Sequence, residues 1–183
     1  LLKAVTPEFV GGRAIEVAGL QDLAFSATRN RFYATTTNGT GPQLIELDPA
    51  TRSVTRQWSL PGTAGLVEVT ASGSQLYVAL NAGTELLRMD LVSGATNLHF
   101  ALPAQILDLV PSPGRESDVV VYRPDQGVQL FRDTAAVGAP LGDHGWLEPD
   151  SAGNRVGAYA GNFYLYSTAG LSLARTGIGG GPF

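Results

Sequence analysis

The chain has 183 residues, of which 15% are charged, and it carries a net charge of −4 with 23 glycines, 11 prolines and no cysteine. This charge balance argues against a nucleic-acid interface, which needs clustered Lys and Arg, and the missing cysteines exclude a disulfide framework and a thiolate metal site. No apolar run approaches the length of a membrane-spanning helix, so no transmembrane segment is expected in this chain.

Short strands joined by turns are predicted throughout the chain. Apolar residues alternate with polar ones, and clusters of Gly, Pro, Asn and Asp separate these runs. None of the runs has sustained helical periodicity, so helix is expected to be nearly absent. In chain order the expected strands are 21–26, 31–37, 43–48, 53–60, 66–70, 75–81, 85–90, 95–102, 106–110, 117–123, 127–132, 135–140, 146–149, 155–160, 163–167 and 171–176.

Two sequence markers recur with a common period of about 40 residues. The first is a strand that reads RNRFYAT and GSQLYVA in the first two units, and it aligns Tyr33, Tyr77, Val120 and Gly157. The second ends a strand before a turn, and it aligns Asp48, Asp90, Asp133 and Ser167. An Asp or Ser that opens a turn accepts a hydrogen bond from a nearby backbone amide, so these acids are interpreted as hairpin caps.

Four short strands in a unit of this length are typical of a propeller blade. The repeat therefore predicts an all-β fold, a β-propeller of four-stranded antiparallel blades, with about four and a half blades present. The expected boundaries are 1–19 for the outer half of a preceding blade, 20–62, 63–103 and 104–143 for three blades, and 144–183 for a fourth blade with a linker to a next one.

An array of this kind leaves a ring open and exposes apolar blade faces. We expect either that this chain is incomplete or that another polypeptide completes the ring. The alternative is a compact ring of four or five blades.

The stretch LIELDPATRSVTRQWSLPGTAGLVEVTASGSQLYVALNAGTELLRMDLVSG (44–94) resembles bacterial YVTN-type propellers and, more loosely, lactonase-like and NHL-like propellers. QLYVALN carries the namesake segment of that family, and LLRMDLVSG carries its Asp-turn segment. The similarity covers units one and two and weakens where Val120 and Gly157 replace the tyrosine. The family pattern has no universal catalytic residues to transfer. Because the family is rich in surface and periplasmic proteins, the resemblance implies a periplasmic, secreted or cell-surface location.

One histidine lies in a cluster of acids, in the stretch GDHGWLEPD. His144 is accompanied by Asp143, Glu148 and Asp150, and imidazole and carboxylate groups are common metal ligands. The spacing matches no metal-binding signature, and the adjacent Asp143 and His144 would face opposite sides of a strand. The preferred interpretation is a blade linker followed by a hairpin turn, because DSAGN aligns with the turns SATRN and ASGSQ. The other histidine, His99, lies on an expected outer strand and is interpreted as structural.

No catalytic set can be recognised in the sequence. The Gly-rich stretches GTGP and GIGGGP open no expected helix, and no Ser lies in a nucleophile elbow. The leading hypothesis is therefore a non-enzymatic propeller scaffold that binds a protein partner or the remaining blades of its ring, as part of a larger extracytoplasmic protein or assembly. No cofactor is expected under this hypothesis. A spacer within a larger surface protein is a further possibility.

The alternative is a lactonase- or lyase-like enzyme whose site lies in the central channel of the propeller and holds Ca²⁺ or another divalent ion. Four acids on the expected inner strands occupy roughly equivalent positions and are the candidate metal ligands: Asp22, Glu68, Asp108 and Glu148. A ring of like charges is costly unless cations or hydrogen bonds offset it. Polar residues of inner strands also simply line a wet channel, and we favour this interpretation.

Overall fold

The computed structural model describes residues 15–112, 115–124, 126–142, 145–149, 155–159, 163–167 and 172–177. None of these residues belongs to a helix, so the described part of the chain has no long apolar helix that could cross a membrane. The strands are β1 Leu20–Ser26, β2 Arg31–Asn38, β3 Gly41–Asp48, β4 Ser53–Ser59, β5 Ala64–Val69, β6 Gln75–Leu80, β7 Glu85–Asp90, β8 Thr96–Ala101, β9 Asp108–Pro111, β10 Asp118–Arg123, β11 Gly127–Arg132, β12 Ala135–Leu141, β13 Gly145–Pro149, β14 Arg155–Tyr159, β15 Phe163–Ser167 and β16 Ser172–Gly177. Every expected strand is present, with ends within two residues of those expected.

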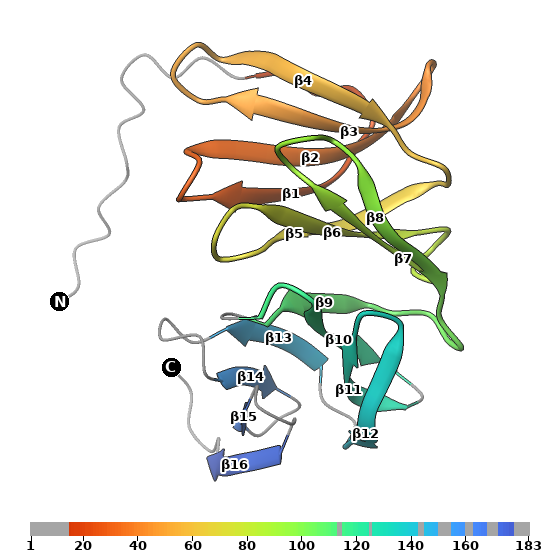
Figure 1. Ribbon diagram of the computed structural model, residues 1–183, viewed down its shortest axis with the longest axis vertical. Coiled ribbons are helices and arrows are strands. Elements are labelled where there is room, and N and C mark those ends of the chain that lie inside the picture. The colour runs from red at the N-terminus through yellow and green to blue at the C-terminus, as the bar shows by residue number, and fades with distance from the viewer. Residues whose placement is uncertain are drawn as a thin grey trace, which may run out of the picture.

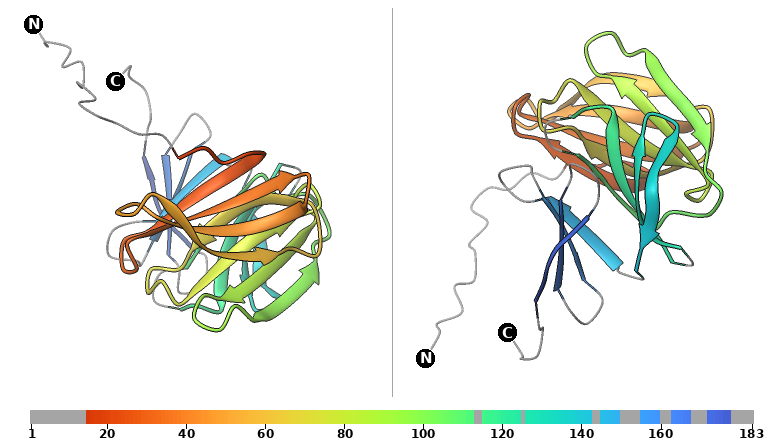
Figure 2. Two further views of the ribbon diagram at one scale, coloured as in Figure 1. Left: turned by 90° about the horizontal axis from the view of Figure 1, so that it is seen from above. Right: turned by 60° about the horizontal axis from the view of Figure 1, so that its bottom comes forward.

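The described strands pair into four sheets, each of four consecutive antiparallel strands. We call these sheets blade 1 (β1–β4), blade 2 (β5–β8), blade 3 (β9–β12) and blade 4 (β13–β16). Figure 1 shows them following one another from blade 1 at one end to blade 4 at the other. The innermost strands β1, β5, β9 and β13 contact each other in this order, and the blades fan out around them (Figure 2). This is a β-propeller arrangement, and the described blades form an open array.

Apolar side chains fill the spaces between neighbouring blades. The three interblade clusters include Tyr33, Leu44 and Leu87 between blades 1 and 2, Tyr77, Leu86 and Val121 between blades 2 and 3, and Val120, Leu130 and Leu147 between blades 3 and 4. The middle strands are buried on both faces for this reason, whereas the outer strands β4, β8 and β12 are mostly exposed.

The strand register confirms that the first sequence marker is a true repeat. Its four residues occupy the same place on the second strand of each blade: Tyr33 lies opposite Glu46, Tyr77 opposite Arg88, Val120 opposite Leu130 and Gly157 opposite Leu165. Both tyrosines belong to the apolar cluster on the side of the next blade. The sequence repeat therefore corresponds to a repeat of position in the structure.

The second marker caps a turn in two of the three blades for which the structure describes this turn. Asp48 Oδ1 accepts a hydrogen bond from the Ala50 amide at 2.8 Å, and Asp90 Oδ1 accepts one from the Val92 amide at 2.9 Å. Asp133 differs from this prediction. Its backbone is left-handed (φ 50°), and its Oδ1 accepts a hydrogen bond from Arg88 of blade 2 at 2.8 Å. The third acid thus ties two blades together.

Some sequence predictions fall outside the described residues. Asp143, His144 and Asp150 are among them, and for Glu148 the structure describes the strand but not the side chain. Of the segment 1–19, only 15–19 are described, and these residues contain no strand.

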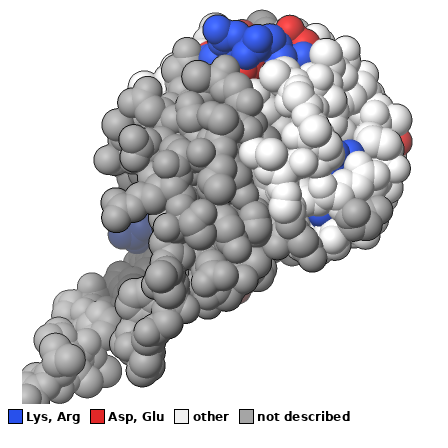
Figure 3. All heavy atoms as spheres, turned by 90° about the horizontal axis from the view of Figure 1, so that it is seen from below, with Lys and Arg blue, Asp and Glu red and all other residues white. Residues whose placement is uncertain are grey.

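Charged side chains are sparse on the described surface, as the composition indicates. In Figure 3, which views the molecule from below, the described part of the face is largely uncharged, and its visible acids and bases gather mainly at one edge. Any interaction through such a face depends on shape and apolar contact more than on charge.

Candidate functional site

The four acids of the predicted channel site fall into two classes in the structure. Asp22 and Asp108 lie opposite Thr35 and Tyr122, two residues beyond the repeat position of their blades. Glu68 and Glu148 lie opposite the repeat position itself, at Tyr77 and Gly157. The expectation of four roughly equivalent positions is therefore wrong: the two classes are offset by two residues, about 7 Å along a strand, and they alternate from blade to blade.

Asp22 and Asp108 hold backbone amides of the next blade. The Val67 amide in blade 2 donates a hydrogen bond to Asp22 Oδ2 at 2.8 Å, and the Leu147 amide in blade 4 donates one to Asp108 Oδ2 at 2.6 Å. Val67 and Leu147 occupy equivalent places, directly after an irregularity in the register of β5 and of β13. Because such a bulge interrupts the backbone ladder, its amide needs another acceptor, and these carboxylates supply it.

A hydroxyl group completes the junction between blades 1 and 2. Thr35 Oγ1 donates a hydrogen bond to the Gly65 carbonyl at 2.5 Å, within the same bulge of β5. Residues of blade 1 thus satisfy both a donor and an acceptor of the bulged strand. An open hollow of about 260 Å³ lies at this end of the inner strands and is lined in part by Gln21, Asp22 and Gln105. Most of the described residues that line this hollow are apolar, and they bring no acid–base pair together.

Within the described residues, no group of three or more His, Cys, Asp and Glu side chains is arranged to hold a metal ion. Asp22 and Asp108 use a carboxylate oxygen in the interblade bonds described above. The metal site of the channel hypothesis remains a prediction. Its candidates stay Asp22, Glu68, Asp108 and Glu148, in the two classes of position described above.

His99 pairs with an acid of its own blade. Its Nε2 lies 2.7 Å from Glu85 Oε2, and the Asn81 side-chain amide donates a hydrogen bond to Glu85 Oε1 at 2.7 Å. These two contacts, with that of Asn81 the stronger, hold the pKa of Glu85 below its ordinary value. Asn81 also accepts a hydrogen bond from the Thr63 amide. This network joins the turn after β6 to the linker before β5. It was not predicted from the sequence, where its only sign is the turn sequence NAGT (81–84).

The repeated tyrosines anchor their blades through their hydroxyl groups. Tyr33 donates to Glu46 Oε2 at 2.9 Å, and burial together with this bond raises the pKa of Tyr33 to about 12. Tyr77 donates to the Glu116 carbonyl of blade 3 at 2.7 Å, and burial raises its pKa. The Glu116 carboxylate accepts hydrogen bonds from the hydroxyls of Ser72 and Ser74. The polar groups of this interface are therefore structural.

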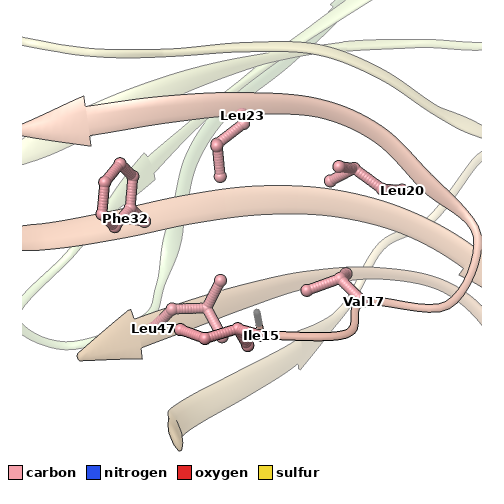
Figure 4. A pocket seen from close by; sticks show the side chains of 6 residues that line it. All are labelled: Ile15, Val17, Leu20, Leu23, Phe32 and Leu47. Atoms are coloured by element: carbon pink, nitrogen blue, oxygen red, sulfur yellow. The ribbon is translucent and has the colours of Figure 1, made fainter. Parts of the chain in front are cut away.

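Among the described residues, three of the exposed large apolar side chains gather on the outward face of blade 1, which is the face turned away from blade 2. Leu20 and Leu23 are each 47% exposed and Phe25 is 50% exposed. The Phe25 and Phe32 rings are 4.8 Å apart. Figure 4 shows the hollow of about 430 Å³ on this face, lined by Ile15, Val17, Leu20, Leu23, Phe32 and Leu47. Apolar patches of this kind mark interaction surfaces. The sequence predicted bare blade faces, but it did not indicate which residues form them.

Comparisons with known proteins place the fold without assigning a family. No family model matches the chain, and no curated protein matches it. The β-propeller domain of Myceliophteria thermophila Cps50 (Swd1) is similar in structure, with a TM-score of 0.72 and 13% identity over 88% of this chain and 56% of that one. Kuenenia stuttgartiensis hydrazine synthase has a TM-score of 0.69 and 13% identity over 94% of this chain and 52% of that one. The chain spans about half the length of these solved chains.

Proposed function

We propose that this propeller is a non-enzymatic scaffold that binds a protein partner through the outward face of blade 1. The observation that carries the proposal is the concentration of half-exposed apolar side chains, Leu20, Leu23 and Phe25, around a hollow on one sheet face. A protein surface provides the extended apolar contact that such a face requires, and the scarcity of charge disfavours a polyanionic partner.

The assignment of the inner-strand acids supports a scaffold over an enzyme. Asp22 and Asp108 act as interblade acceptors, which accounts for two of the four channel carboxylates without catalysis. The finer assignment to the YVTN-type propellers and the extracytoplasmic location rest on the resemblance of residues 44–94, and both are part of this proposal.

Site-specific photo-crosslinking tests the scaffold function. A photo-crosslinking amino acid replaces Phe25 in one variant and Val92, which is 70% exposed on a turn of blade 2, in the matched control. In lysate of the source cells and in purified protein, we expect discrete protein adducts from position 25 and few from position 92. Adducts at neither position, or equal adducts at both, would contradict binding through this face.

The channel-enzyme alternative has its own test. If a divalent ion binds among the inner strands, Ca²⁺ or Mn²⁺ raises the unfolding temperature of the chain, because a ligand of the folded state stabilises it. A rise that Glu68→Gln removes would favour the metal site over the scaffold. No rise, or one that survives this substitution, leaves the acids as structural residues.

A further inference from the structure

We propose that the protein partner of the outward face of blade 1 binds by strand addition: residues 10–16 of this chain supply the outer strand of a further blade on this face, and the partner supplies the three strands nearer the axis. The inference rests on the proposed function, since it states how the partner of the same face binds. The occupant is a set of antiparallel strands with one apolar side, carried by another protein.

The two interfaces on either side of blade 2 share a pair of apolar residues at the end of an outer strand. Trp58 and Leu60 pack in the cluster between blades 1 and 2, and Phe100 and Leu102 pack in the cluster between blades 2 and 3. In each pair an exposed residue lies between the two. Such a pair brings the end of an outer strand onto the face of the next blade.

Ile15 and Val17 occupy the same place on the outward face of blade 1. Both are half-buried against a cluster on β2 and β3 that includes Leu47, and the exposed Glu16 lies between them (Figure 4). This face therefore already carries the end of a segment that packs as an outer strand does in the other two interfaces.

The backbone also enters blades 1 and 2 in the same way. The Thr37 amide donates a hydrogen bond to the Gly19 carbonyl at 2.9 Å, and the Asn81 amide donates one to the Thr63 carbonyl at 2.9 Å. Thr37 and Asn81 lie at the same distance after the repeated tyrosine of their blade. The segment before β1 therefore has the place of a linker between two blades.

The sequence agrees with this place. The stretch RAIEV (13–17) aligns with RQWSL (56–60) at the end of β4, with the apolar pair in the same positions. Arg13 thus corresponds to Arg56, whose guanidinium donates hydrogen bonds to two carbonyls of the turn after β7. In the proposed arrangement Arg13 lies at the equivalent turn after β3, which includes Ala50.

The bare half of the face indicates which strands the partner supplies. In the interface between blades 1 and 2, β1, β2 and β3 contact the inner strand β5. On β1 the equivalent side carries Leu20, Leu23 and Phe25, which are about half exposed. The register aligns them with three residues of β5 that lie in or against the cluster with blade 1: Ala64, Val67 and Val69. The contacts that β1 lacks are therefore those that the first three strands of a blade make.

The partner is expected to use backbone pairing and apolar packing together. Within the described part of the chain, residues 15–17 pair with no strand. A strand edge without a neighbour presents amide and carbonyl groups to an added strand. The added strands should direct apolar or aromatic side chains toward β1, as Tyr33 and Leu44 of blade 1 do in the cluster with blade 2.

A crosslinking experiment on the purified chain tests the place of the outer strand. The chain has no cysteine, so introduced cysteines are the only thiols. A short bifunctional maleimide should join Arg13→Cys to Ala50→Cys about tenfold faster than it joins Arg13→Cys to Val92→Cys, because proximity raises the effective concentration of the second thiol. Val92, on an exposed turn of blade 2, is the matched control. Similar rates for the two pairs would overturn the inference.

Proline substitution tests the strand addition itself, with the photo-crosslinking amino acid at position 25 in lysate. Proline lacks the amide hydrogen, and successive amides of a strand point to opposite edges, so one of Arg13→Pro and Ala14→Pro removes a bond to the added strand. That variant should lower the yield of partner adducts by about threefold or more. Ala4→Pro, outside the outer strand, and Ala14→Gly, which keeps the amide, are the controls and should retain the adducts. Circular dichroism shows whether each variant is folded.

The outcomes separate this inference from the scaffold function. Partner adducts that persist in both proline variants would overturn strand addition and leave binding through the face intact. No adducts from position 25 would contradict the scaffold function, and the inference would fall with it. A fast crosslink between positions 13 and 50, together with adducts that one proline variant reduces, supports both.

Discussion

Two equivalent sheet faces of this molecule differ in burial. On blade 2, Val67 and Leu76 face blade 1 and are fully buried. On blade 1, the equivalent Leu23 is 47% exposed and Phe32 borders an open hollow. The residue types are alike, so the difference in burial comes from the presence or absence of an adjoining blade. The exposure of Leu23 therefore reflects the lack of an adjoining blade on this face among the described residues.

The comparison of covered and bare faces predicts different costs for the same truncation. Leu76→Ala removes a fully buried side chain between blades 1 and 2 and leaves a cavity, and we expect it to lower the free energy of unfolding by about 2–5 kcal/mol. Leu23→Ala removes the same atoms from the bare face and should cost under about 1 kcal/mol. Urea unfolding of the purified chain measures both values. Similar costs for the two variants would mean that the face of blade 1 is covered within the monomer.

Loss of the hydrogen bond between Asp22 of blade 1 and the Val67 amide of blade 2 is expected to have the next largest effect on stability. Asp22→Ala leaves the Val67 amide without its acceptor, and the expected loss is about 1–3 kcal/mol. Asp22→Asn retains a side-chain oxygen at the same place and should lose clearly less. Equal losses from Ala and Asn would show that the charge, not the hydrogen bond, is what stabilises the junction. Urea unfolding of the two variants in parallel makes the measurement.

The strands and their arrangement were predictable because two local patterns recur together. The tyrosine positions and the acids that open turns depend on residues within one hairpin, so a repeat in sequence translates directly into a repeat in structure. Asp133 departs from the pattern because it lies one residue beyond the register place of Asp90, which Arg132 holds in blade 3, and it contacts Arg88 across a blade boundary. No local pattern reports a contact of that kind.

The contacts of the inner-strand acids were not predictable for a related reason. Their offset can be counted in the sequence, because Asp22 lies 11 residues before Tyr33 whereas Glu68 lies 9 residues before Tyr77. The irregularities of register in β1 and β5 lie on the N-terminal side of these acids and leave no clear sequence signal. The Val67 amide that bonds Asp22 directly follows such an irregularity in the neighbouring blade, so this hydrogen bond depends on the fold of that blade.

Alkaline titration should also detect the packed interface between blades 1 and 2, to which Tyr33 belongs. The pKa of Tyr33 is raised in the folded state to about 12, above the value of about 10 for an unfolded chain. The stabilisation linked to its neutral form is therefore fully present below pH of about 10 and is lost as pH rises through about 12. Tyrosinate absorbance should show that Tyr33 ionises later than exposed tyrosines, and Tyr33→Phe should remove one late-ionising group. Ionisation of every tyrosine near pH 10 in folded protein would indicate that the interface opens.

The smallest effect on stability is expected at the outer rim of the interface between blades 1 and 2. The Arg56 guanidinium of blade 1 donates hydrogen bonds to the Leu91 carbonyl at 2.6 Å and the Val92 carbonyl at 3.2 Å, and it lies 4.6 Å from the centre of the Trp58 ring. Its planar fork reaches both carbonyls at once, which the single ammonium group of a lysine cannot match.

Removing this contact tests whether the rim adds to the apolar core of the interface. We expect Arg56→Ala to lower the free energy of unfolding by about 0.5–1.5 kcal/mol, Arg56→Lys to recover part of that loss, and the exposed neighbour Gln57→Ala to change little. Urea unfolding of the three variants measures these differences. If Arg56→Lys matched the wild type, charge alone would hold the rim. If Gln57→Ala cost as much as Arg56→Ala, the loss would come from β4 itself rather than from the contact between blades 1 and 2. In that case, only apolar contacts would distinguish the covered face of blade 2 from the bare outward face of blade 1.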